Sequence, residues 1–279
     1  MTTTAMPRPR LSPLMIRILS GAIFIAVVLA ALYIGTYGAY VLATVLAGLA
    51  LWEFRGLSDA MGSRAPSWLL FPLGAFFVFS GTVLKQVDLA VVLSLALVGG
   101  LAAFLVVPGR RQGLGRWAMG LAGALYIGMP FNYYLLLYTS QPHGLIWTAF
   151  TIFAVIASDA AALLVGSRLG KHPFFASISP HKTLEGAVAG VVAAVVVMLV
   201  GVSLVLGISP LHAILIGFLV GTTAELGDLV ESQMKRIAEV KDSSHLIPGH
   251  GGVLDRLDSI LFPPILVYFY VTMFGLLTR

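Results

Sequence analysis

The chain has 279 residues, of which 58% are hydrophobic and only 10% are charged, and its mean hydropathy is +0.96. Soluble domains are about 25% charged and disordered chains are poor in hydrophobic residues, so the composition excludes both classes. The net charge of +5 indicates a membrane surface as partner, and we expect no nucleic acid. The absence of cysteine excludes disulfides, thiolate zinc sites and cysteine nucleophiles. The composition therefore indicates a polytopic membrane protein.

Nine apolar stretches have or approach the length that crosses a bilayer. A hydrocarbon core of about 30 Å takes about 20 helical residues. The stretches lie near residues 14–34, 36–56, 67–86, 88–107, 115–138, 145–168, 184–207, 209–227 and 259–277. They are apolar on all sides and far longer than barrel strands, which alternate over about ten residues. We therefore predict an all-α, polytopic integral membrane protein with about nine transmembrane helices.

The basic residues predict the orientation. If the N-terminus is inside, fifteen of the seventeen Lys and Arg residues lie in inner segments, and only Lys85 and Arg279 lie outside. Arg8, Arg10 and Arg17 before the first stretch also resemble a signal peptide, but the eight later stretches favour a retained anchor. We expect a cytoplasmic N-terminus in a cell (inner) membrane protein.

The chain divides into two halves of different character. Residues 1–150 are predicted to form a transmembrane scaffold, in which Trp52-Glu53-Phe54 is typical of an interfacial belt, although such an acid can also orient a lipid headgroup. Residues 151–279 are predicted to form the catalytic domain, because nine of the twelve acids fall between 159 and 258. Ionisable groups at membrane depth cost at least about 2.5–3.5 kcal/mol each. These acids must therefore pair, bind an ion or face water.

The first charged cluster surrounds the segment 168–183. Asp159 lies well inside the preceding helix, where it is either neutralised by a neighbour or in contact with substrate or an ion. The bases of the segment, including Lys182, suit a polyanion, and positive-inside bias explains them equally well. Thr183 is placed to cap the next helix, with Glu185 in its first turn.

The second cluster begins on a helix. Glu225, Asp228, Ser232 and Lys235 fall on one helical face, which alone is more typical of a solvated face. The residues that follow this helix in the sequence favour a ligand-binding site instead. Pro-Gly-His-Gly-Gly at 248–252 can bring N–H groups together around phosphate oxygens, and two acids then open the last span. Carboxylates from two helix ends beside a glycine-rich, basic loop predict a site for Mg²⁺ and phosphates.

At these residues the chain resembles the phosphatidate cytidylyltransferase (CDP-diacylglycerol synthase) family. The signature reads Ser232-Gln-Met-Lys235-Arg236, then Lys241-Asp242, Pro248-Gly249-His250-Gly251-Gly252 and Asp255-Arg256-Leu-Asp258, and every fixed position matches. The resemblance extends firmly over about 155–262. Four positions depart from the common family pattern; they are Ala160, Leu163, His181 and Leu184.

The resemblance implies that CTP and phosphatidate give CDP-diacylglycerol and pyrophosphate. It also implies Mg²⁺ as cofactor, either alone or with a second cation, and a homodimer as the assembly. We expect Asp228 and Asp255 to hold the metal, with Asp258 as a further ligand. The residues expected to act on phosphates or in catalysis are Lys235, Arg236, Lys241, Asp242, His250 and Arg256, and those expected to line the substrates are Asp159, Lys182, Glu185, Ser232, Gly249, Gly251 and Gly252. For His250, stabilisation of the turn is the alternative role.

Two other functions fit parts of the pattern. A related membrane CTP-dependent transferase would use another lipid phosphate or a polyprenol, and its tail pockets cannot be read from the sequence. A cation-coupled transporter also places acids at membrane depth, but it predicts ionisable groups spread over repeated halves with a site near mid-membrane. Here the ionisable groups gather at one end of the chain, beside a loop of the phosphate-binding kind.

Overall fold

The computed structural model describes residues 13–106 and 110–277, and within these ranges the ordered elements are ten helices. They are α1 (Pro13–Ile34), α2 (Thr36–Ala60), α3 (Ser67–Phe79), α4 (Leu89–Val106), α5 (Arg110–Thr139), α6 (Gly144–Leu169), α7 (Leu184–Leu206), α8 (Pro210–Ile237), α9 (Leu254–Leu261) and α10 (Pro263–Met273). In the same ranges extended pairing is limited to isolated bridges, Pro173 with Thr183 and Ile247 with Gly251. The predicted all-α class is confirmed.

Five helical segments are long and apolar enough to cross a membrane. They are α2, α6, α7, α8 and residues Gly113–Thr139 of α5. Shorter apolar helices cover Leu19–Ile34, Ser67–Phe79 and Leu89–Ala102. The chain is therefore an integral membrane protein, whereas nine full spans and a cytoplasmic N-terminus stay predictions. Arg8, Arg10 and Arg279 lie outside the described residues.

Two of the predicted spans differ in the structure. The stretch 67–86 is helical only to Phe79 and continues in turns that contain Gly81. The stretch 259–277 divides into α9 and α10 at Phe262, because Pro263 and Pro264 lack the N–H groups that a continuous helix would need. Helix α9 begins at Leu254, five residues before the predicted span, and ends at Leu261, just before the apolar α10.

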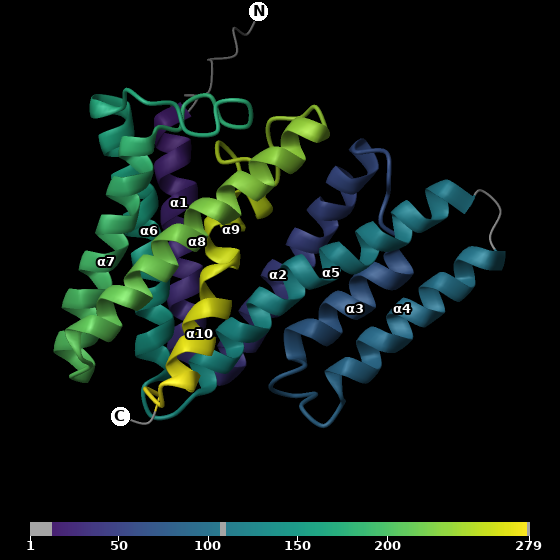
Figure 1. Ribbon diagram of the computed structural model, residues 1–279, viewed down its shortest axis with the longest axis horizontal. Coiled ribbons are helices and arrows are strands. Elements are labelled where there is room, and N and C mark those ends of the chain that lie inside the picture. Colours follow the sequence, from purple (N-terminus) through teal and green to yellow (C-terminus); the bar gives the residue numbers. More distant parts are fainter. Residues whose placement is uncertain (1–12, 107–109, 278–279) are drawn as a thin grey trace, which may run out of the picture.

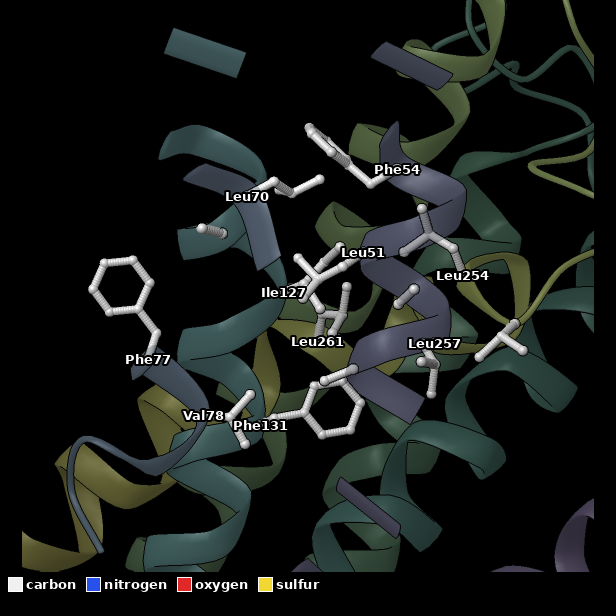
Figure 2. Packing of buried hydrophobic residues seen from close by; sticks show 14 of the residues in the cluster. Leu51, Phe54, Leu70, Phe77, Val78, Ile127, Phe131, Leu254, Leu257 and Leu261 are labelled. Atoms are coloured by element: carbon white, nitrogen blue, oxygen red, sulfur yellow. The ribbon is translucent and has the colours of Figure 1, made fainter. Parts of the chain in front are cut away.

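The helices pack into two clusters of buried apolar side chains. The first joins α2, α3, α5 and α9, with Leu51, Ile127 and Leu257 among its members (Figure 2). The second joins α6, α7, α8 and α10, with Trp147 and Met198 fully buried. In Figure 1, α3 and α4 lie at one end of the molecule and α6 and α7 at the other. Because α9 belongs to the first cluster, the C-terminal part of the chain packs into the N-terminal scaffold.

The polar face of α8 points toward the interior of the protein. Glu225 and Glu231 are buried, whereas Leu226, Val230 and Ile237 on the opposite side are 51%, 39% and 55% exposed. In water such a helix would face the other way, but lipid tails cover apolar side chains on the outside of a membrane protein. The predicted polar stripe is therefore confirmed as a face, and it is turned into the protein instead of toward solvent.

Helices α8 and α9 touch backbone to backbone at Gly227. A Cβ atom there would collide with the carbonyl oxygen of Asp258, so only glycine lets the two helices approach at this point. This contact brings Asp228, the next residue along α8, beside the acids of α9.

We predict that Gly227→Ala lowers the thermal unfolding midpoint of the purified protein by several degrees. The added methyl group forces the two helices apart, and overpacking of this kind costs about 1–3 kcal/mol. Gly56→Ala is the matched control, because a Cβ at this exposed position of α2 meets nothing within 4 Å and should leave the midpoint unchanged or raise it. Equal midpoints for the two variants would contradict the close approach.

Candidate functional site

Lys182 joins the segment between α6 and α7 to the polar face of α8. Its Nζ lies 2.7 Å from an oxygen of Glu225 and 2.9 Å from an oxygen of Asp228. Burial alone would lower the pKa of Lys182, but the two carboxylates outweigh it and raise that pKa above its ordinary value. The ammonium group therefore stays charged and ties the two elements together. The structure thus brings together Lys182 and Asp228, two of the site residues predicted from the sequence, and their predicted contacts with substrate and metal stay predictions.

Glu185 holds the start of the same segment. Its carboxylate accepts hydrogen bonds from the backbone N–H groups of Lys171, at 3.1 Å, and His172, at 3.2 Å, and its other oxygen lies 2.6 Å from Nδ1 of His172. Thr183 accepts from the N–H of Gly186, which confirms the predicted helix cap. These contacts make Glu185 a support of the segment, and its predicted contact with substrate stays a prediction.

Asp159 lies near the acids of α8 and α9. Its side chain is exposed on α6, and its carboxyl group is within electrostatic range of Asp258, Asp228 and Glu225. Ser232, one turn further along α8, donates to Asp228 at 3.1 Å. The structure therefore gathers Asp159, Asp228, Ser232 and Asp258 in one polar region between α6, α8 and α9.

A second lysine joins α8 to α9. Nζ of Lys235 lies 2.7 Å from Oδ1 of Asp255 and 3.4 Å from an oxygen of Glu231. Oδ2 of Asp255 accepts from the N–H and the hydroxyl of Ser243 and from the N–H of Gly252, each at 2.8 Å. Burial alone would raise the pKa of Asp255, but these hydrogen bonds and the lysine outweigh it and lower that pKa. Both oxygens of Asp255 are thus engaged within the protein.

Glu231 is a member of the site that the sequence reasoning missed. Its side chain is fully buried, its carboxyl group lies 3.4 Å from Nζ of Lys235, and it also interacts with the carboxyl group of Asp258. A carboxyl group in this position is costly unless it is paired. The signal that could have found it is its spacing of four residues from Lys235, which places both on one helical face.

The glycine-rich turn is compact and anchored. Gly249 and Gly251 have positive φ angles of 78° and 81°, which glycine adopts without strain, and Ile247 donates to the carbonyl of Gly251 at 2.8 Å. Nδ1 of His250 lies 2.7 Å from the hydroxyl of Ser20 on α1. The structure therefore gives His250 a partner that holds the turn, and its predicted contact with phosphate stays untested.

The N–H groups that follow the turn do converge, but they bind carboxylates of the chain. The N–H of Gly252 donates to Asp255, and those of Val253 and Leu254 donate to Glu53 at 2.9 and 2.6 Å. The interfacial-belt interpretation is wrong for Glu53, which is only 1% exposed, and it stays a prediction for Trp52, which is 54% exposed. Phosphate binding at Gly249, Gly251 and Gly252 remains a prediction.

The other basic residues predicted to belong to the site lie at the protein surface, near the end of α8 and the start of α9. Arg236, Lys241 and Arg256 are exposed and Asp242 is half-buried. Nε of Arg236 donates to the carbonyl of Ile178 at 3.0 Å, which ties the end of α8 to the segment before α7. These three cations therefore lie where an anion from solvent can reach them.

The oxygen donors suit a hard cation. Asp159, Asp228 and Asp258 provide carboxylates, which are ligands of Mg²⁺. Within residues 13–106 and 110–277, however, no group of three or more His, Asp or Glu side chains is close enough to hold a metal ion. The donor chemistry fits magnesium, and the ligand set stays a prediction.

These features define an integral membrane protein with a polar site formed at helix ends. A family model described as "Cytidylyltransferase family" matches residues 15–274, so the chain belongs to this family. The predicted membership and the predicted nucleotidyltransferase activity class are thereby confirmed, which sets aside the transporter alternative.

Curated relatives from bacteria carry the name phosphatidate cytidylyltransferase. The chain is 31% identical to that of Staphylococcus saprophyticus over 252 residues, which cover 88% of this chain and 95% of the relative. It is 39% identical to that of Bacillus subtilis over 153 residues and 47% identical to that of Helicobacter pylori over 139 residues. The last two matches span 54% and 50% of this chain and only 57% and 51% of the relatives.

We predict that Asp255→Asn lowers the thermal midpoint by the same amount at pH 5 and at pH 8. A carboxyl group with a lowered pKa contributes stability above its unfolded pKa, about 3.9, and loses it only as the pH falls through the lower folded pKa. Asp255 is therefore ionised at both pH values. The control is Asp59→Asn, which breaks an exposed ion pair with Arg64 at 3.4 Å and should change little. A smaller loss at pH 5 than at pH 8 would contradict the lowered pKa.

Proposed function

We propose that the protein transfers CMP from CTP to phosphatidate, giving CDP-diacylglycerol and pyrophosphate. Membership in the family and the names of the relatives support this reaction. The observation that carries it is the pair of lysines beside an exposed set of basic residues: acids of α8 hold Lys182, and acids of α8 and α9 hold Lys235. Such a site suits two phosphate-bearing substrates that repel each other.

In the proposed reaction, an oxygen of the phosphatidate phosphate forms a bond to the α-phosphorus of CTP. The bond from that phosphorus to the bridging oxygen of the β-phosphate breaks, and its electron pair leaves with pyrophosphate. Little covalent chemistry falls to the protein, so positioning and charge neutralisation dominate. Arg236, Lys241 and Arg256, which are exposed, would bind the triphosphate. Lys182 would stand nearest the attacking phosphate.

Magnesium is part of the proposal. The ligands expected from the sequence are Asp228 and Asp255, with Asp258 as a further one. Because Lys235 and Ser243 engage the oxygens of Asp255, the carboxylates of Asp228 and Asp258 are the more suitable pair. When bound, Mg²⁺ would neutralise phosphate charge as the two anions meet. Ser232 would orient Asp228, to which it donates, and Asp159 would complete the wall of the site.

We further propose that the site faces the cytoplasm from the inner membrane and that the lipid enters from the side. An apolar groove of about 430 Å³ between α7 and α8 supports lateral entry, because it is lined by Val188, Val192, Phe218 and Leu226 and reaches Glu225. An acyl chain placed there would leave its headgroup near Lys182. A homodimer, as the family resemblance suggests, is part of this proposal.

We predict that Asp228→Asn reduces the incorporation of labelled CTP into lipid more than tenfold at saturating Mg²⁺. The amide cannot supply the negative charge that the cation and Lys182 require. Asp88→Asn is the control, since Asp88 lies apart at the start of α4, where it accepts from the N–H of Ala90, and asparagine caps equally well. Activity within threefold of the parent would defeat the role of Asp228.

A second prediction concerns His181, an exposed residue beside Lys182 where the family commonly has lysine. His181→Lys should raise the rate at pH 8 at least twofold, because the ammonium group of lysine is a strong charged donor to phosphate oxygens. The measurement is the incorporation of labelled CTP into lipid by variant and parent at pH 8. Equal rates would argue against a phosphate contact at this position.

A further inference from the structure

Glu53 is a buried acid in the middle of the charged network, although it comes from the N-terminal half of the chain. It is 1% exposed, and none of the ion pairs between described residues includes it. Its carboxylate instead accepts hydrogen bonds from two hydroxyls, those of Ser243 at 3.1 Å and Ser244 at 2.6 Å, and from two backbone N–H groups. A carboxylate has about four acceptor positions, so this one is fully engaged.

The two backbone donors are the N–H groups at the start of α9. The N-cap residue Val253 has an apolar side chain and provides no cap of its own. Glu53 on α2 provides the missing cap, because its oxygens accept hydrogen bonds from the N–H groups of Val253 and Leu254. A carboxylate at a helix N-terminus also interacts favourably with the helix dipole. Helix α9 is therefore capped by a residue 200 positions earlier in the chain.

The same carboxylate is one contact away from Asp255. The hydroxyl of Ser243 lies 3.1 Å from Glu53 and 2.8 Å from Oδ2 of Asp255. Gly252 packs against both groups of this link, since a Cβ added there would collide with the hydroxyl of Ser243 and lie 2.7 Å from both oxygens of Glu53. Any side chain at this glycine would displace Ser243 and Glu53 from the chain before α9. The second glycine of the pair is thus needed for close packing between Glu53 and the chain before α9.

Apolar packing fixes the helix that carries Glu53. Its neighbours Leu51 and Phe54 lie in the same buried cluster as Leu254 and Leu257 of α9 (Figure 2). The backbone of α2 is therefore held against α9 on both sides of the acid. This arrangement fits a residue that sets the position of α9, and it does not fit one that reaches for a lipid headgroup.

We propose that Glu53 is a positioning residue of the transferase: it caps α9 and, through Ser243, fixes the orientation of Asp255 and hence of Lys235. The proposal rests on the proposed function for its kinetic consequence. Its structural consequence, the capping of α9 from α2, is independent of the substrate. The N-terminal half of the chain thereby takes part in the reaction without touching the reacting atoms.

The test compares Glu53→Gln, Ser243→Ala and the double variant in the full-length protein. We expect Glu53→Gln to lower kcat at least tenfold while the KM for CTP changes less than threefold, because the substrate-binding bases remain. The double variant should lose less than the product of the two single losses, since both changes break the same link. The matched control is Asp59→Asn on the same helix, an exposed acid that should leave kcat within twofold.

Hydrogen exchange provides a readout that needs no activity. In Glu53→Gln, the N–H groups of Gly252, Val253 and Leu254 should exchange at least tenfold faster while those of α3 and α7 keep the rates of the parent. Unchanged exchange at 252–254 together with an unchanged kcat would overturn the proposal. Faster exchange throughout the molecule would also overturn it, because Glu53 would then act on stability alone. A parent protein that transfers no CMP would refute the proposed function, and the exchange rates would still decide the role of Glu53.

Discussion

The structure depends on the placement of carboxyl groups inside a helix bundle where water cannot stabilise them. Each buried acid near α8 and α9 meets this constraint with a specific donor. Lys182 faces Glu225 and Asp228, Lys235 faces Glu231 and Asp255, and Glu53 faces backbone N–H groups. Because an unpaired charge in such surroundings costs several kcal/mol, these partners cannot separate independently. The network therefore fixes the geometry of the site as well as its charge.

These contacts connect parts of the chain that are far apart in the sequence. Lys182 reaches α8 from the segment before α7, and Glu53 reaches the start of α9 from α2. The leucines of α9 then complete an apolar cluster with α2, α3 and α5. The boundary predicted near residue 150 thus describes a change in composition. In space, α9 from the C-terminal half packs into the N-terminal scaffold.

Local patterns were sufficient to predict some of this site. The cap at Thr183 and the polar face of α8 follow from residue type and helical spacing, and both are confirmed. The role of Glu53 did not follow, because an acid between two aromatic residues resembles an interfacial anchor until its distant partners are known. The same reason explains the turn at 248–252: its sequence predicts converging N–H groups, but only the fold shows that carboxylates of the chain occupy those after it.

The distribution of charge divides the region into two zones. The inner zone holds two ammonium groups, Lys182 and Lys235, against the carboxyl groups of α8 and α9 with which they pair, and Asp159 and Asp258 add further acids. An excess of carboxyl groups repels phosphate and attracts cations. The outer zone, with Arg236, Lys241 and Arg256 exposed, has the opposite preference. In the proposed reaction, a polyphosphate held by the outer bases would bring its reacting phosphorus to the inner zone against this repulsion, and a cation between them would offset it, which is the physical reason for proposing magnesium there.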